Sequence, residues 1–297
     1  MNVLIEATGS LISGYLIKSI QEADFKAICT DISDFGHAPS LCDKFYILPE
    51  VSDSMYWEKV DNLLDRYHID IVIPSLDETL IAWSYKKEYF RKKNIYVVLS
   101  DSDLIDTFTD KYKAFNFFKE AGIKTPNTSL DQNYSLVKPR FGRGGEGIYI
   151  GANKQNMSGM VSQEYIPGVE YTVDCLFDVK GVAVYIVPRI RMGVKDGKST
   201  KGVVIKNKRI EEIIKSISDR VKFQGPINFQ FIEDGDSNIY ILEINPRIAG
   251  GMALGFAATE NWIPLIIENF IHGKSIKEKQ PIQYGLKMAR YYSECFI

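Results

Sequence analysis

The first hundred residues alternate short apolar runs with amphipathic stretches. Runs of consecutive apolar residues predict buried strands, and apolar positions spaced three or four apart predict helices. We expect strands over 2–7, 25–32, 44–49, 69–75 and 95–100, and helices over 11–23, 54–68 and 77–93. Strands that alternate with helices in this order are typical of a doubly wound parallel sheet.

The pattern changes after an amphipathic helix expected over 110–123, which Gly122 and Pro126 end. From about residue 134 the chain consists mainly of strands and turns. Strands are expected over 135–140, 147–151, 160–166, 170–178, 181–192 and the segments flanking 234–237, with helices over 206–221 and 260–274. This predicts an α/β domain over 1–103 and an α+β domain over 104–297. The second divides into a smaller part, about 104–170, and a larger part, about 171–297.

The most informative stretch reads as two strands joined by a tight Asp-Gly-Asp-Ser turn. Because side chains alternate faces along a strand, Asn228 and Gln230 share one face, and Glu243 and Asn245 share a face of the partner. If the strands pair in register, a carboxylate and several amide oxygens converge, with Arg247 just beyond. Hard oxygen ligands suit Mg²⁺, and a neighbouring arginine suits phosphate. The hairpin therefore predicts a metal–triphosphate site.

A glycine-rich loop over 139–147 lies between two expected strands. Its glycines allow backbone N–H groups to approach a ligand closely, as phosphate binding requires. It is not a Walker loop, because no Gly-Lys-Ser/Thr follows and a strand comes next. A flexible hairpin turn is the alternative, but Lys138 and Arg140 at the entrance favour phosphate.

Three other segments carry candidate chemistry. Residues 163–170 form a strand, a Pro-Gly turn and a second strand, where exposed backbone could bond adenine. Arg189 and Arg191 share one strand face and suit a bound anion. The lysines of 195–202 indicate a solvated, mobile basic loop. The turn over 8–14 has only half of a dinucleotide fingerprint, although Asp31 sits where a ribose-binding acid is expected.

Composition limits the classes of protein. The 297 residues are 45% hydrophobic and 25% charged, with a net charge of −2, so no basic field invites nucleic acid or anionic membrane. Four scattered cysteines without a CxxC pair are expected to be reduced thiols in a cytoplasmic protein. The N-terminus lacks the basic region of a signal peptide, and no apolar stretch approaches the roughly 20 residues that span a bilayer.

Taken together, these pieces resemble the ATP-grasp superfamily, and most nearly a single-copy relative of the carbamoyl-phosphate synthetase large subunit. The order of Asp110-Lys111, LVKPRFGRGG, QEYIPGVEYTVD, MGVKDGKST and GPINFQF…YILEINPRIAGGMAL carries the resemblance over roughly residues 1–270. It implies a pre-ATP-grasp domain followed by an ATP-grasp fold of two α+β subdomains. Lys195 replaces a histidine frequent in the family, which speaks against bicarbonate or carbamate chemistry.

The resemblance also implies a role for individual residues. ATP phosphates would be bound by Lys111, Lys138 and the loop residues Gly142, Arg143, Gly144 and Gly145; adenine by Gln163, Glu164, Tyr165 and Ile166; ribose by Glu170; and Mg²⁺, or alternatively Mn²⁺, by Gln230, Glu243 and Asn245. Arg247 would neutralise the transferring phosphoryl group, assisted by Arg189 or Arg191. Such positioning and charge neutralisation are what phosphoryl transfer requires of a protein.

The expected activity is an ADP-forming ligase that activates a carboxylate as an acyl phosphate and joins it to an amine. Asp77 and Glu78 are candidates for amine binding, although a helix cap is the role expected for Asp77. The expected partners are these small molecules, with no nucleic acid and no membrane, and a homodimer is the default assembly. Alternatives are a nucleotide-binding subunit that needs a partner, a carbamoyl-phosphate-synthetase-like activity and, from the front domain alone, an NAD-dependent dehydrogenase.

Overall fold

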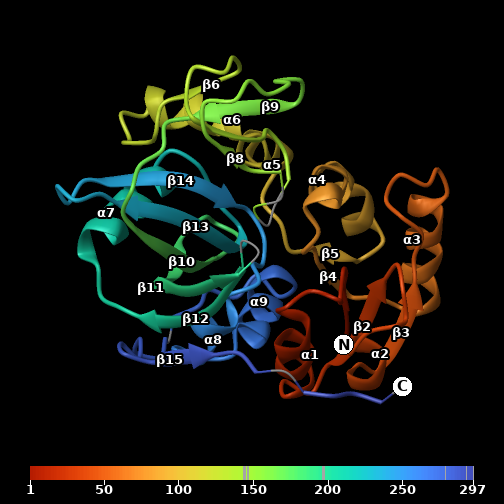
Figure 1. Ribbon diagram of the computed structural model, residues 1–297. Coiled ribbons are helices and arrows are strands. Elements are labelled where there is room, and N and C mark those ends of the chain that lie inside the picture. Colours follow the sequence, from red (N-terminus) through yellow and green to blue (C-terminus); the bar gives the residue numbers. More distant parts are fainter. Residues whose placement is uncertain (143–144, 146, 196–197, 278, 292, 297) are drawn as a thin grey trace.

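The computed structural model describes residues 1–142, 145, 147–195, 198–277, 279–291 and 293–296. Its first part is a parallel five-stranded sheet of order β3-β2-β1-β4-β5 (Figure 1). The strands are β1 (Asn2–Ile5), β2 (Lys26–Asp31), β3 (Lys44–Ile47), β4 (Ile71–Ile73) and β5 (Tyr96–Val97). The helices are α1 (Ser13–Gln21), α2 (Ala38–Leu41), α3 (Tyr56–Arg66) and α4 (Asp77–Lys92). The order in which the strands are added to the sheet reverses between β1 and β4, the point where open α/β sheets bind ligands.

The remainder contains two antiparallel sheets. The smaller has the order β6-β9-β7-β8 and the larger β14-β13-β10-β11-β12-β15. The smaller sheet and its helices comprise α5 (Ser102–Thr109), α6 (Lys111–Glu120), β6 (Thr128–Ser129), β7 (Leu136–Pro139), β8 (Tyr149–Ile150) and β9 (Met160–Gln163). The larger comprises β10 (Val169–Phe177), β11 (Ala183–Lys195), β12 (Lys198–Val204), β13 (Gly225–Glu233), β14 (Ile239–Asn245) and β15 (Lys287–Ala289), with α7 (Lys208–Ser218), α8 (Ala253–Ala257) and α9 (Trp262–Phe270).

The large sheet has one apolar face and one face that is polar near the candidate site. Phe229 and Phe231 of β13 pack with Ile210 and Ile214 of α7 in one core cluster. The residues between them along β13 point the other way, as strand alternation requires. The hydrophobic core therefore fixes the register of β13 and presents its polar residues on the opposite face.

The predicted parallel sheet and the α+β second half are confirmed. The expected mobile loop over 195–202 is corrected, because Lys198–Val204 forms β12 and pairs with β11. The structure also adds α2, α5, α8, β6 and β15, which were not predicted. The expected boundary after residue 103 falls inside α5, which packs against α4, α6 and β14. No helix within the described ranges is both long and apolar enough to cross a membrane.

Candidate active site

The hairpin of β13 and β14 pairs Gln230 with Glu243 and Asn228 with Asn245. All four side chains therefore share one face of the sheet, and a bulge follows Gln230. The neighbouring strand β10 adds Asp174 opposite Asn228, whose Nδ2 donates to the Asp174 carboxylate at 2.8 Å. Local strand alternation and one buried hydrogen bond thus hold the oxygens in place.

Two arginines of β11 extend this polar face. The Arg189 Nε donates to Asp174 Oδ2 at 2.8 Å, and both side chains are buried. The Arg191 Nη1 lies 2.9 Å from Glu170 Oε2 and 3.4 Å from Gln230 Oε1. Burial lowers the pKa of Arg191, and the carboxylate of Glu170 opposes that shift. Cations therefore line the face beside the carboxylate of Glu243. The negative charge of Glu243 also opposes the lowering of the Arg191 pKa.

Arg247 lies in the loop after β14 and makes a two-pronged ion pair with the N-terminal domain. Its Nε and Nη2 donate to the two oxygens of Asp77 at 2.9 and 2.6 Å, and Nη1 donates to the Ile248 carbonyl. The expected cap at Asp77 is corrected: the N-cap of α4 is Leu76, with no side-chain bond, and Asp77 is its first helical residue. Its carboxylate orients Arg247 instead.

Lys138 on β7 is the most buried lysine of the site, 8% exposed. Its Nζ donates to Gln163 Oε1 at 2.7 Å, and the Gln163 amide donates to Thr128. Burial lowers the pKa of Lys138 to about 8, partly offset by Glu243 and reinforced by Lys111. The structure therefore directs two lysines and the hairpin carboxylate toward one another. A phosphate placed here would gain charge-assisted hydrogen bonds.

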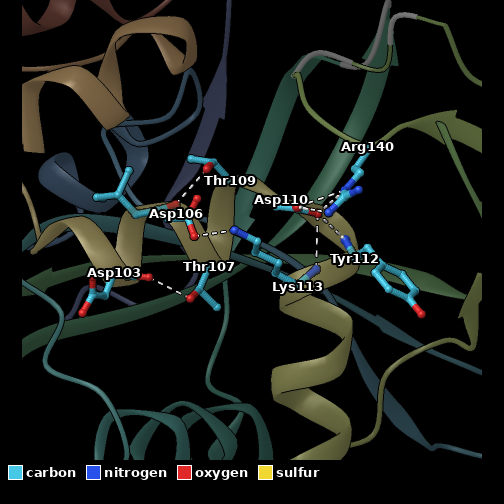
Figure 2. Close-up of polar contacts among 9 residues, drawn as sticks. Asp103, Asp106, Thr107, Thr109, Asp110, Tyr112, Lys113 and Arg140 are labelled. Atoms are coloured by element: carbon cyan, nitrogen blue, oxygen red, sulfur yellow. Dashed lines mark hydrogen bonds and ion pairs between the residues drawn. The ribbon is translucent and has the colours of Figure 1, made fainter. Parts of the chain in front are cut away.

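The start of α6 is fixed to the glycine-rich loop through Asp110. This buried carboxylate accepts hydrogen bonds from Nε and Nη2 of Arg140 and from the N–H groups of Tyr112 and Lys113 (Figure 2). Burial acts to raise the pKa of Asp110, but these bonds lower it below its ordinary value. Lys111 follows directly, and its Nζ donates to the Gly142 carbonyl at 2.9 Å. Asp110 thus positions a phosphate-binding lysine at the loop.

Within the loop, Gly142 and Gly147 adopt φ angles of 107° and 69°. Residues that carry a side chain rarely adopt such positive φ angles, so this bend requires glycine. A Cβ at Gly147 would also lie only 3.0 Å from the Pro139 ring. The candidate residues Arg143 and Gly144 lie outside the described residues.

In the segment after β9, backbone groups rather than side chains are available to bind a ligand. The Glu164 carboxylate accepts from the backbone and side-chain nitrogens of Asn127, so it holds the neighbouring turn. In the described part of the chain, the backbone groups of Tyr165 and Ile166 make no hydrogen bond with protein. They are available to a planar base with its own donors and acceptors.

A cleft of about 750 Å³ joins these parts. All the described residues predicted for the site line it: Lys111, Lys138, Gly142, Gly145, Gln163, Glu164, Tyr165, Ile166, Glu170, Arg189, Arg191, Gln230, Glu243, Asn245 and Arg247. The cleft continues to the carboxyl ends of the parallel strands, where Glu6, Asp31 and Tyr56 lie. A smaller cavity of about 180 Å³ adjoins it and contains Asp77 and Glu78.

The donor set fits Mg²⁺ held jointly with phosphate. Among the described residues, no three His, Cys, Asp or Glu side chains gather as a self-sufficient metal cluster. Glu243 supplies one carboxylate, and Asn245 and Gln230 supply amide oxygens on the same face. Mg²⁺ is commonly bound by one or two carboxylates together with substrate phosphates. The chemistry of the site therefore suits a metal that arrives with a nucleotide.

Two carboxylates organise the edge of the site; sequence reasoning considered Asp31 for ribose binding and gave no role to Glu6. Glu6 is 3% exposed and accepts from Thr79, Trp83 and two N–H groups at the start of α4, and burial raises its pKa. Asp31 accepts from the N–H of Gly9 at 2.6 Å, so it fixes the turn after β1. In the sequence, each is visible as an acidic residue at the end of an apolar strand. Their roles could not be predicted, because their hydrogen-bond partners lie far away along the chain.

Two family models match the chain. Residues 156–293 match "ATP-grasp in the biosynthetic pathway with Ter operon", and residues 3–98 match "PylC-like, N-terminal domain". The chain is thus an ATP-grasp protein in fold. More particularly, residues 156–293 are similar to that ATP-grasp family, and residues 3–98 are similar to the PylC-like N-terminal domain.

Relatives and solved structures agree with this assignment. The carbamoyl phosphate synthase large chain of Clostridium acetobutylicum is 24% identical over 92% of this chain, which spans only 28% of that relative's length. An ADP complex of N5-carboxyaminoimidazole synthetase from Staphylococcus aureus has a TM-score of 0.77 at 16% identity, covering 98% of this chain and 82% of that one. An L-amino acid ligase from Bacillus licheniformis has a TM-score of 0.71 at 16% identity, covering 91% and 74%.

Proposed function

We propose that the chain is an ADP-forming ligase that joins a carboxylate to an amine by way of an acyl phosphate. The observation that carries the proposal is one continuous cleft. Lys138, Glu243 and Arg247 lie along it, and it opens onto the strand ends of the N-terminal domain. One part suits a metal–triphosphate, and the other is large enough for an organic substrate. The similarity to a solved structure named as an L-amino acid ligase supports the same chemistry.

Each residue has a defined task in this proposal. Lys111 and Lys138 bind phosphate oxygens of ATP, and the backbone of Tyr165 and Ile166 bonds the adenine. Glu243 and Asn245, with Gln230, would hold Mg²⁺, which would neutralise charge on the phosphates. Glu170 reaches the ribose hydroxyls once its pairing with Arg191 adjusts.

The reaction needs no side-chain nucleophile. A carboxylate oxygen of the substrate attacks the γ-phosphorus, the bond to the bridging oxygen breaks, and ADP leaves. The amine nitrogen then attacks the acyl carbon, inorganic phosphate leaves with the C–O bond electrons, and the nitrogen loses a proton. Arg247, oriented by Asp77, faces the developing negative charge, and such charge stabilisation is the main contribution a protein makes to phosphoryl transfer.

The decisive experiment measures ADP and phosphate release from Mg²⁺-ATP by the purified chain. Pools of amino acids and sugar acids serve as carboxylates, with ammonia, amino acids and amines as acceptors. Stimulated ADP release that depends on both a carboxylate and an amine is the expected result. Tight Mg²⁺-ATP binding without stimulation by any pool would instead indicate a nucleotide-binding subunit that acts with a partner.

A further inference from the structure

One donor of Arg189 has no partner, although the side chain is buried. Its Nε and Nη2 bind the Asp174 carboxylate at 2.8 and 3.3 Å, and the residue is 2% exposed. Its Nη1 is buried without a hydrogen-bond partner among the described residues. Because a buried donor left unpaired costs free energy, this one calls for an acceptor. Arg189 lines the cleft, so a ligand can supply it.

Arg290, just after β15, also has a buried donor without a partner among the described residues. Its Nη1 donates to the Leu11 carbonyl at 2.7 Å, and its Nη2 donates to the Gly250 carbonyl. Its Nε is buried and has no partner in the described part of the chain. Carbonyl oxygens bond this guanidinium, but no carboxylate of the described residues pairs with it. One positive charge therefore stays uncompensated between the N-terminal domain and the ATP-grasp domain.

The two arginines approach each other across the Gly250–Gly251 loop. A Cβ at Gly251 would overlap Nη2 of Arg189 and lie 2.8 Å from its Cζ. Gly250, one residue earlier, bonds Arg290. Burial lowers the pKa of Arg290, and the positive charge of Arg189 lowers it further. The second effect is the repulsion expected between two neighbouring cations. Leu11, Gly250 and Gly251 all line the cleft.

We propose that Arg189 and Arg290 together form an anion subsite that binds a carboxylate of the organic substrate, between Leu11 and the Gly250–Gly251 loop. The proposal rests on the ligase function proposed above. A carboxylate offers two oxygens, one for Nη1 of Arg189 and one for Nε of Arg290, and its charge balances the surplus cation. The segment just after β15 thereby contributes a specificity residue, and an anion bound there bridges the two domains.

The test titrates the full chain, saturated with Mg²⁺-ADP so that Lys111 and Lys138 are occupied, with acetate or inorganic phosphate at constant ionic strength. Calorimetry gives the affinity of each anion. Acetate is expected to bind the wild-type chain, and Arg290→Gln to weaken it about tenfold or more, the loss expected for a hydrogen bond to a charged group. Lys287→Gln, at an exposed lysine of the adjoining strand β15, is the matched control and keeps wild-type acetate affinity.

A role for Arg290 confined to joining the domains predicts a lower unfolding temperature for Arg290→Gln but unchanged acetate affinity, and that result overturns the proposal. Arg290-dependent binding of phosphate in preference to acetate overturns the carboxylate assignment. Arg290→Lys retains the charge without Nε and is expected to bind acetate with intermediate affinity, which provides a second variant if Arg290→Gln does not fold. If Mg²⁺-ADP fails to bind, the ligase proposal fails separately, and acetate titration of the nucleotide-free chain still tests the subsite.

Discussion

Glu243 is the residue on which the candidate cation site depends, because it supplies the carboxylate of the β13–β14 hairpin. Replacing it with Gln keeps the volume and removes the charge, so the fold should survive. We expect carboxylate-dependent ADP release to fall at least about 100-fold, as when a preorganised electrostatic contact is lost from an active site. Steady-state ADP release and far-UV circular dichroism measure the two effects.

Glu212→Gln is the control for this change, because Glu212 is exposed on α7, outside the residues lining the cleft. It should leave ADP release unchanged. A Glu243→Gln protein with wild-type turnover would contradict the metal assignment.

Lys138 gives the site a pH dependence. Its native pKa is about 8, against 10.5 for an ordinary lysine, chiefly because of burial. In the nucleotide-free chain it therefore loses its charge as the pH rises through 8, and we expect Mg²⁺-ADP affinity to decline there. Lys138→Met, which lacks the titrating group, should bind ADP more weakly at pH 7 and show a flatter profile. Calorimetric titration between pH 6.5 and 9.5 checks this expectation.

The lowered pKa of Lys138 also makes the free energy of unfolding depend on pH. Between pH 8 and 10.5 the unfolded chain keeps the proton that native Lys138 has lost, so the native state gains stability as the pH rises. Below pH 8 the buried charge is present in full, and its cost is constant. The wild type should thus gain stability relative to Lys138→Met only above pH 8, by about 1.4 kcal/mol for each pH unit at most. Urea unfolding of both proteins at pH 7 and 9 measures the difference.

Sequence reasoning performed best where a residue's environment is local. The shared face of Gln230 and Glu243 follows from the period of a strand and a short turn, both visible in the sequence. The partners of Arg247 and Arg189 were not predictable in this way. Asp77 is 170 positions from Arg247, and no spacing rule connects them. The role of Arg290 was missed because it arises only after the last strand returns to the N-terminal domain.

At the scale of elements, two aspartates near α6 offer a matched comparison (Figure 2). Asp110 is 1% exposed, caps the helix and binds Arg140, whereas Asp106 pairs with Lys113 on the surface, both about half exposed. We expect Asp110→Ala to lower the free energy of unfolding by about 3–5 kcal/mol, because it removes a cap and leaves Arg140 without its partner. Asp106→Ala should cost less than about 1 kcal/mol. Urea denaturation of both variants gives the two values.

The Asp110 change should also affect the site, because Lys111 is held to Gly142 at the same helix end. Mg²⁺-ADP affinity is therefore expected to fall in Asp110→Ala and to stay unchanged in Asp106→Ala. Equal stability losses in the two variants would mean that α6 is held by its apolar face alone.

Element prediction succeeded for long periodic segments and failed for short ones. The helix at Lys208–Ser218 has a clear apolar stripe and was expected. The strand β15 has three residues and, among the described residues, pairs with β12 at the edge of the sheet. Its position comes from pairing with a strand some 85 residues earlier in the chain, a contact that no local pattern indicates. α5 was missed because an interdomain boundary was expected at its position.

At the scale of the whole molecule, polar contacts between the N-terminal domain and the large sheet set the shape of the cleft. Lys87 on α4 donates to the Gln224 side chain at 3.0 Å, and the Asn261 amide donates to the Ser19 carbonyl at 2.6 Å. The ion pair of Asp77 and Arg247 differs from these because it lies beside the candidate cation site. This ion pair therefore both contributes to coupling between the domains and positions a reactive group.

Asp77→Asn tests whether this ion pair serves both roles. It keeps the volume but removes the charge opposite Arg247, which is 8% exposed, so we expect a loss of about 3–5 kcal/mol in the free energy of unfolding. Carboxylate-dependent ADP release should fall, while Mg²⁺-ADP affinity stays near wild type because Lys138 and Tyr165 are untouched. Calorimetric unfolding, ADP release and ADP titration separate these effects.

Asp101→Asn is the interdomain control, because Asp101 is 78% exposed and its partner Lys87 keeps two other acceptors. It should cost less than about 1 kcal/mol and leave turnover intact. If Asp77→Asn were equally mild, the Ile248 carbonyl and Asn245 would suffice to hold Arg247 from within its own domain. The reactive arginine would then be positioned without the N-terminal domain, and that domain's part in catalysis would be limited to binding the substrate.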